Sequence, residues 1–251
     1  MVVTVSFFDD TSAPEFGEYR KLKHEVFVLE QGWQLPLDAD DQRVAPDPFD
    51  PHSMFVIGRV GGQTVGIARA TMIDDGFPHA EFFTELMQRP ELRGVRTAVA
   101  TVNAVAVLPA FRGRPLRVEG GARSMTTAKA LMVELARRLE RGGAEVVLLT
   151  TSPGVAAVFF DHLGFYLIGP PFRSDGRRLI NMGLGVHDAD HFRAIGSPLA
   201  DEAFAKGASE AERRCIDYFR KRAAAVLGGR SMEEFCHKEL SPAPSPAAPS
   251  A

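Results

Sequence analysis

The segment from Thr97 to Leu108 constrains the fold of this chain more than any other part of the sequence. Most of its residues are small or branched and apolar, on both of the faces between which a strand alternates. That pattern is typical of a strand covered on both sides, as at the centre of a sheet. Pro109 follows directly and stops the strand, because proline has no backbone N–H to donate to a neighbour.

The flanking segments predict a mixed α/β fold. Apolar runs favour strands over the first eight residues and over 54–60, 63–70, 145–150, 165–168 and 178–186. Helical spacing of apolar residues favours helices over 14–31, 80–87, 123–141, 153–163, 210–227 and 231–240. Gly61 and Gly62 supply the positive φ angles of a hairpin turn. Residues 34–52, rich in proline and aspartate, are expected to form a long irregular loop.

Length and composition indicate one main core. A chain of 251 residues, 45% of them hydrophobic, can bury one substantial core with a helical appendage, but not two large independent domains. We expect a core over residues 1–186 and a helical extension over 187–240 packed on it. Residues 241–251 consist of proline, alanine and serine alone. Such a segment cannot bury enough apolar surface to order itself, so we expect a disordered tail.

Charge and cysteine content indicate the kind of partner and compartment. A net charge of -3 gives no overall attraction to nucleic acid, so we expect a small-molecule partner. Cys215 and Cys236 lack metal-ligand spacing, and two cysteines do not make a disulfide framework, which fits a reducing cytoplasm. The N-terminus has no basic leader, and no apolar run is long enough to cross a bilayer, so we expect no transmembrane segment.

A basic, glycine-containing segment follows the central strand. Gly113, Gly120 and Gly121 permit close approach of the backbone, while Arg112 and Arg114 add positive charge. Backbone amides between a strand and a helix N-terminus commonly bind phosphate. The segment therefore predicts an anion site, with an ordinary solvated basic loop as the alternative, because no strict phosphate-binding glycine motif is present.

The chain resembles the GNAT superfamily of N-acyltransferases over about residues 3–186. The resemblance rests on a strand, the Val-x-Pro-x-Phe-Arg-Gly stretch starting at Val107, a helix, a strand, and the segment from Ser152 to Phe165. It implies a mostly antiparallel central sheet flanked by helices, with two central strands that splay apart. Val105 and Val107 are thereby implied to bind the pantetheine arm of an acyl thioester. The residues implied to surround its phosphates are Arg112, Gly113, Arg114, Gly120, Gly121 and Ser124.

The N-terminal half also resembles a narrower group, the acyl-homoserine-lactone synthases and the long-chain N-acyl amino acid synthases. The features that carry this resemblance are Glu25 to Trp33, an acidic loop through Asp47, and Arg69. It implies that Phe27, Trp33 and Arg69 contact substrate. Thr101 and Ala104 stand where lactone synthases are expected to carry glutamate and arginine, which argues against lactone production. Leu163 to Phe165, followed by Gly169 to Phe172, resembles the N-acyl amino acid synthases more closely.

The expected chemistry needs a base for the amine and an acid for the thiolate. Glu30 and His52 are the candidate bases, with Asp50 as an alternative to His52. The structural alternatives are a solvated helix face for Glu30 and a loop contact for His52. Phe160 stands where many GNAT enzymes place a tyrosine that protonates sulfur, so it is assigned to the substrate pocket. Tyr166 or a bound water is expected to replace that acid.

The leading interpretation is an acyltransferase that transfers acyl groups other than amino-acyl groups. It moves the acyl group from acyl-CoA or an acyl-phosphopantetheine carrier protein to the amine of an amino acid or similar small molecule, by direct attack and without a metal. The alternatives are an acyl-homoserine-lactone-type signal synthase and a non-catalytic GNAT-like module that binds an acyl thioester. The C-terminal helices are expected either to cover the acyl pocket or to form a homodimer contact.

Overall fold

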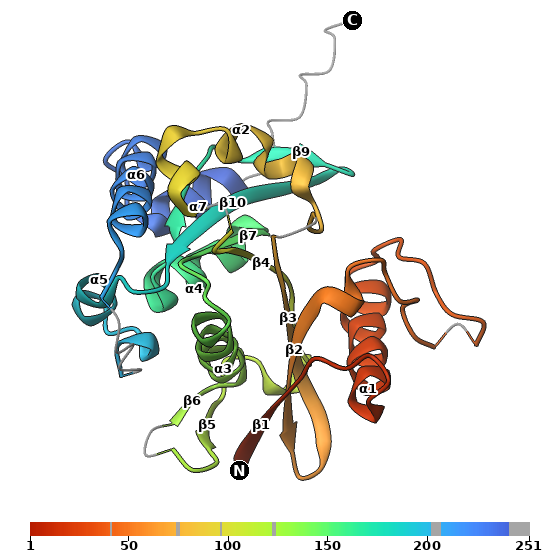
Figure 1. Cartoon of the computed structure of the whole chain (residues 1–251). Coiled ribbons are helices and arrows are strands. Elements are labelled where there is room, and N and C mark those ends of the chain that lie inside the picture. The colour runs from red at the N-terminus through yellow and green to blue at the C-terminus, as the bar shows by residue number, and fades with distance from the viewer. Residues whose placement is uncertain (41, 74–75, 96, 122–123, 202–206, 241–251) are drawn as a thin grey trace, which may run out of the picture.

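The computed structural model describes residues 1–40, 42–73, 76–95, 97–121, 124–201 and 207–240. The expected disordered tail, residues 241–251, lies outside the described residues. In Figure 1 the strands run through the middle of the molecule, with helices on both sides of them.

Ten strands of the described chain form one mixed sheet in the order β6-β5-β1-β2-β3-β4-β7-β10-β8, with β9 paired to β10. The strands are β1 Val2–Phe8, β2 Ser53–Val60, β3 Gln63–Met72, β4 Val99–Val107, β5 Pro115–Val118, β6 Ser124–Thr126, β7 Val146–Thr151, β8 Tyr166–Leu167, β9 Phe172–Ser174 and β10 Arg177–Gly185. Neighbours are antiparallel except for β4 with β7 and β1 with β5, which are parallel. The mostly antiparallel sheet predicted from the sequence is therefore confirmed.

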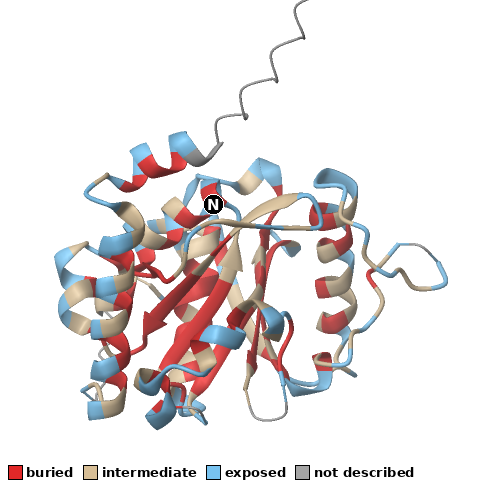
Figure 2. Cartoon of the chain, turned by 90° about the horizontal axis from the view of Figure 1, so that it is seen from above, coloured by how far each residue is buried: buried red, intermediate tan, exposed pale blue. Residues whose placement is uncertain are grey.

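Helices cover both faces of the sheet. They are α1 Pro14–Lys23, which continues as a π-helical segment His24–Glu30, α2 Thr84–Met87, α3 Thr127–Arg141, α4 Pro153–Leu163, α5 Ala189–Ala194, α6 Glu210–Leu227 and α7 Met232–Leu240. Helix α3 packs on strands β1 to β4, and α1 lies on the opposite side of β3 and β4. Figure 2 shows that the buried residues follow the strands and the inward sides of the helices.

Three local features differ from the sequence expectations. The helix expected over 14–31 is α-helical only to Lys23 and then widens into the π-helical segment. The basic segment expected to be a loop contains the β5–β6 hairpin, because the open edge of β1 pairs with β5. The short elements β9 and α5 had no clear signal, since each spans only a few residues.

The C-terminal helices share the main core with the sheet. Cys215 and Phe219 of α6 and Phe235 of α7 are buried in the same cluster as the central strands. Helix α6 approaches β10 so closely that a Cβ built on Gly185 would lie 2.4 Å from a side-chain carbon of Ile216. The absence of a side chain at this position is therefore what permits the close packing of helix on strand.

We predict that Gly185→Ala lowers stability by about 1–3 kcal/mol, the usual range for overpacking a filled core. The added methyl group has to displace Ile216 and crowds a carboxylate oxygen of Glu212, 3.3 Å away. Urea unfolding monitored by fluorescence measures the change in midpoint. Gly169→Ala is the control, because nothing lies within 4 Å of the Cβ that it would add. Equal midpoints for the two variants would show that α6 can move away from β10.

A buried ion pair also fastens α6 to the end of the sheet. The Nδ1 atom of His187 lies 2.7 Å from Oε2 of Glu212, whose side chain is completely buried. The hydrogen bond to Glu212 raises the pKa of His187, and burial opposes this only in part. A pKa that is higher in the folded chain means that folding favours the protonated imidazole.

We predict that the His187–Glu212 pair stabilises the folded chain fully below the ordinary histidine pKa of about 6.5. This stabilisation is lost as pH rises through the raised pKa of His187. The stability difference between the wild-type protein and His187→Gln should therefore shrink with rising pH. Urea unfolding at a series of pH values measures it. His162→Gln, which changes an exposed histidine of α4, should show no such trend. If the stability difference between the wild-type protein and His187→Gln stays constant with pH, protonation of His187 is not linked to folding.

Candidate active site

Strands β4 and β7 open the sheet at its centre. They pair in parallel only from Val99 with Val146 to Val102 with Leu149, and beyond that point they diverge. In the described chain, residues 104–107 of β4 therefore pair with β3 alone. The β3–β4 register shifts so that Arg69 lies opposite Ala104 but Ala70 lies opposite Val102, which leaves Asn103 as an extra residue. Such a β-bulge bends its strand and re-aims the side chain that it carries.

The opening between the two strands is a cleft of about 520 Å³, within the usual size range of a small-ligand site. Its lining residues come from β4, β7, the start of α4, the β9–β10 hairpin and the segment after α1. They are Phe27, Gln31, Trp33, Val102, Asn103, Ala104, Val105, Leu149, Thr150, Thr151, Ser152, Pro153, Val155, Phe159, Arg177, Arg178 and Leu179. We call this the larger cleft. Its walls are mainly apolar, which suits an acyl chain or a pantetheine arm.

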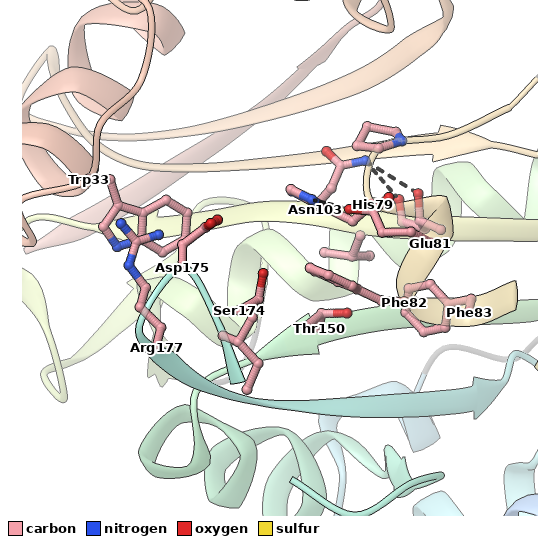
Figure 3. A pocket seen from close by; sticks show the side chains of 14 residues that line it. Trp33, His79, Glu81, Phe82, Phe83, Asn103, Thr150, Ser174, Asp175 and Arg177 are labelled. Atoms are coloured by element: carbon pink, nitrogen blue, oxygen red, sulfur yellow. Dashed lines mark hydrogen bonds and ion pairs between the residues drawn. The ribbon is translucent and has the colours of Figure 1, made fainter. Parts of the chain in front are cut away.

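A smaller cleft of about 140 Å³ adjoins it. Figure 3 shows its lining side chains, which converge from the β9–β10 hairpin, from β4 and β7, and from the turn before α2. They are Trp33, Pro78, His79, Glu81, Phe82, Phe83, Thr101, Val102, Asn103, Thr150, Ser174, Asp175, Arg177 and Leu179. Asn103, Thr150, Trp33 and Arg177 line both clefts, so the two compartments meet at the bulge of β4.

The smaller cleft carries charges of both signs. Arg177 lies over the Trp33 ring, 4.3 Å from its centroid, and Glu81 and Asp175 contribute carboxylates. His79 stacks on Phe82 with ring centroids 5.3 Å apart, and its Nδ1 lies 3.8 Å from a carboxylate oxygen of Glu81. A ligand that bears both an ammonium and a carboxylate group would find a partner for each of them here.

A buried polar network holds Asn103 in place. Arg69, only 3% exposed, donates from Nε to Asn103 and from Nη1 to Asp47 and Asp50. The Asn103 amide donates in turn to Thr71, at 3.1 Å. Arg69, expected to contact substrate, therefore lies behind the cleft wall, and its link to the cleft runs through Asn103.

The aromatic residues predicted from the narrower resemblance do line the clefts. The backbone N–H of Trp33 donates to the carbonyl of Phe27 at 2.8 Å, a wide turn that continues the π-helical segment. This turn brings the two rings to a centroid distance of 4.7 Å. Val105, expected beside pantetheine, lines the larger cleft as well. The carbonyl of Val107, at the end of the strand, accepts a hydrogen bond from Arg112 at 2.8 Å.

The candidate acids and bases lie outside the two sets of lining residues. Glu30 receives two hydrogen bonds from Arg112, of 2.5 and 2.6 Å, which lower its pKa and make it a weaker proton acceptor. His52 is exposed in the short turn before β2. Tyr166 is buried, donating to Asp188 at 2.7 Å and accepting from Arg220 at 3.1 Å.

The other predicted residues lie on neighbouring elements. Phe160 is half-buried and packs into the core, whereas the preceding residue, Phe159, lines the larger cleft. The residues expected near phosphate lie on or beside the β5–β6 hairpin, at the sheet edge beyond β1, and line neither cleft; they are Arg112, Gly113, Arg114, Gly120, Gly121 and Ser124. Their role toward a donor stays a prediction.

Sequence reasoning missed most of the polar residues of the smaller cleft, among them His79, Asn103, Asp175 and Arg177. Asn103 was the one polar amide inside an otherwise buried strand, which is a usable signal. Asp175 is followed by Gly176, and both have positive φ, so the pair forms the Asp-Gly hairpin turn that presents Arg177. His79 carries no local signal, because the long-range arrangement of the sheet brings it to the cleft.

The acidic loop is occupied by internal ion pairs. Asp38 contacts Arg20 at 2.8 Å, and Asp47 contacts Lys23 at 3.7 Å in addition to Arg69. No group of three or more potential metal ligands gathers within the described parts of the chain. None of the helices described is both long and apolar enough for a membrane crossing.

Comparisons with known proteins identify the fold. No protein-family profile matches the sequence, and no curated protein matches it. Among solved structures, the acyl-homoserine-lactone synthase LasI is 17% identical with a TM-score of 0.57, covering 83% of this chain and 96% of its own. MesI, a CoA-dependent acyl-homoserine lactone synthase, is 15% identical with a TM-score of 0.56 over 77% and 95% of the two chains.

FeeM, an N-acyl amino acid synthase from uncultured soil microbes, is 15% identical with a TM-score of 0.55. The match covers 80% of this chain and 99% of FeeM. At such low identity these likenesses concern the fold and not the substrates. The chain therefore has the GNAT-type fold that these synthases share, as the sequence predicted.

Proposed function

We propose that this protein is an N-acyltransferase that moves an acyl group from a pantetheine thioester to the amine of an amino acid. The observation that carries the proposal is the meeting of two compartments at the bulge of β4. A thioester in the larger cleft and an amine in the smaller cleft would be held side by side at Asn103 and Thr150. Holding two reactants in this way removes much of the entropic barrier to their reaction.

The free edge of β4 supports the donor half of the proposal. Ala104 and Val105 pair with β3 and also line the larger cleft, and no other described strand pairs with them there. An extended pantetheine arm with its two amide groups can pair with such an edge as an added strand does. FeeM and MesI, which share the fold, are named as synthases of acylated products, and MesI is CoA-dependent. The donor class is therefore acyl-CoA or an acyl carrier protein.

The charges of the smaller cleft support the acceptor half. Glu81 and Asp175 favour an ammonium group, and Arg177 favours a carboxylate, which together describe an α-amino acid. The neutral amine attacks the thioester carbonyl, the C–N bond forms, and the C–S bond breaks to release a thiol. Neither cysteine of the chain suits a covalent intermediate, since both are buried and burial raises the pKa of Cys215 to about 12.

A lactone-forming signal synthase is the second candidate, because LasI and MesI carry that name and share the fold. That reaction would require S-adenosylmethionine as the acceptor instead of an amino acid. Thr101 lines the smaller cleft where the narrower resemblance leads us to expect a glutamate, which favours the amino acid acceptor.

We predict that the purified protein forms N-acyl amino acids when it is incubated with acyl thioesters and a pool of amino acids. Mass spectrometry of the products and thiol release measure the reaction, with acetyl, octanoyl and palmitoyl groups on both CoA and carrier protein. S-adenosylmethionine is supplied separately, and an acylated lactone from it would support the second candidate. Thioester binding without any acylated product would contradict both, and would favour a non-catalytic binding module.

We predict that Arg177→Gln raises KM for the amino acid roughly 10- to 100-fold, the effect of losing a charge-assisted hydrogen bond to a carboxylate. Arg177 also borders the larger cleft. KM for the thioester should nevertheless change less, since its arm is proposed to pair with the backbone of β4 rather than with this side chain. Arg173→Gln is the matched control, because Arg173 lies on the same hairpin but lines neither cleft. Equal effects of the two substitutions would contradict a carboxylate contact at Arg177.

A further inference from the structure

The backbone at His79 has a conformation that its position in the fold does not explain. Among the described residues other than glycine, only His79 and Asp175 have positive φ, at 62° and 48°. Asp175 is accounted for by the Asp-Gly turn between β9 and β10. His79 instead precedes a 3-10 turn over Ala80–Phe83, a place where an extended backbone is usual. Left-handed backbone costs energy for such a residue, and strain of this kind gathers at functional sites.

The surrounding turn is fixed firmly enough to maintain that conformation. The N–H of Phe82 donates to the carbonyl of His79 at 3.0 Å, and the Phe82 ring stacks on the imidazole. The Asn181 amide donates to the carbonyl of Phe82 at 2.7 Å, and Thr150 donates to Asn181 at 2.7 Å. Contacts from β7 and β10 thus hold the turn, and with it His79, against the smaller cleft.

The imidazole is accessible from the smaller cleft. The side chain is 55% exposed, and Figure 3 shows it among the lining residues at the end of the cleft near Asn103 and Glu81. Three charged groups line the same cleft: Glu81 on its own turn, and Asp175 and Arg177 on the β9–β10 hairpin. Glu81 lies beside Nδ1 of the ring, which leaves Nε2 as the nitrogen available to a ligand.

We infer that His79 is the general base that deprotonates the acceptor ammonium group. The inference rests on the proposed function and names a catalytic residue for it. Of the three ammonium protons, one passes to Nε2 of His79 and then to water. A second passes to the sulfur as the C–S bond breaks, and the third stays on the amide nitrogen. The carboxylate of Glu81 beside Nδ1 stabilises the imidazolium ion that forms.

The other ionisable groups suit this role less well. Glu30 is paired with Arg112 outside both clefts, and His52 lines neither of them. Glu81 and Asp175 do line the smaller cleft, but ordinary carboxylates are weak bases toward an ammonium group. Histidine is the side chain that proteins use most often for proton transfer near neutral pH.

The test compares the wild-type protein with His79→Asn in the product assay. Asparagine adopts left-handed backbone more readily than most residues. This substitution therefore removes the imidazole without adding strain to the turn. We expect kcat/KM to fall ~10²–10⁴-fold, the usual contribution of a general base. We also expect the loss of activity toward acid pH to move to higher pH, toward the pKa of the amine itself, because without the base only acceptor that is already neutral can attack. Added imidazole should restore part of the activity of His79→Gly.

His162→Asn is the control, since His162 is exposed on α4 and lines neither cleft. Full activity in His79→Asn would overturn the inference. So would a slower His79→Asn reaction that keeps the wild-type acid limb, together with no gain of activity in His79→Gly on adding imidazole. The proposed function would survive either result, because the wild-type protein would still form product. No product from the wild-type protein with any donor and acceptor would overturn the proposed function and this inference together.

Discussion

The buried guanidinium of Arg69 is the interaction on which the site depends. A charge removed from water in this way is tolerated only if it is paired and hydrogen-bonded. Its partners come from the loop before β2, through Asp47 and Asp50, and from β4, through Asn103. One side chain therefore fixes a loop, a strand and a bulge relative to one another. The pairing of β4 with β7 ends at Val102, next to Asn103, so the side chain that Arg69 holds lies where the two clefts open.

This arrangement gives the acidic loop a structural role. Its described aspartates contact arginine or lysine side chains of α1, of β3 or of the loop itself, which leaves them little attraction for a ligand. Carboxylates and a guanidinium that are open to a ligand lie instead on the turn before α2 and on the β9–β10 hairpin, where they line the smaller cleft; the proposed acceptor would bind there. The site is thus built from segments that are far apart in sequence and meet only across the opened sheet.

The sequence predicted what local patterns determine. The central strand, the hairpin with Gly61 and Gly62, and the helices beginning at Pro153 and Glu210 were correctly predicted, because periodicity and turn residues specify them. The β5–β6 hairpin was expected to be a loop, since its pairing with β1 joins segments more than a hundred residues apart in sequence. Phe27, Trp33 and Val105 line the larger cleft, and their contacts with substrate or pantetheine stay a prediction. His79 and Arg177 depend on long-range packing and could not be identified from local patterns.

In the proposed reaction, the acidity of the leaving thiol accounts for a site without a tyrosine at Phe160. Phe160 has no proton to donate, and the phenol of Tyr166 is bonded to Asp188 and Arg220, where it helps to join α6 to the sheet. The pKa of Tyr166 is raised, mainly because the phenol is buried, and this makes it a poorer acid. A thiol is fairly acidic, so its thiolate leaves without full protonation in the transition state. An ammonium group, by contrast, cannot attack until it loses a proton. The demand for proton transfer therefore falls on the amine side, in the smaller cleft, where the histidine lies.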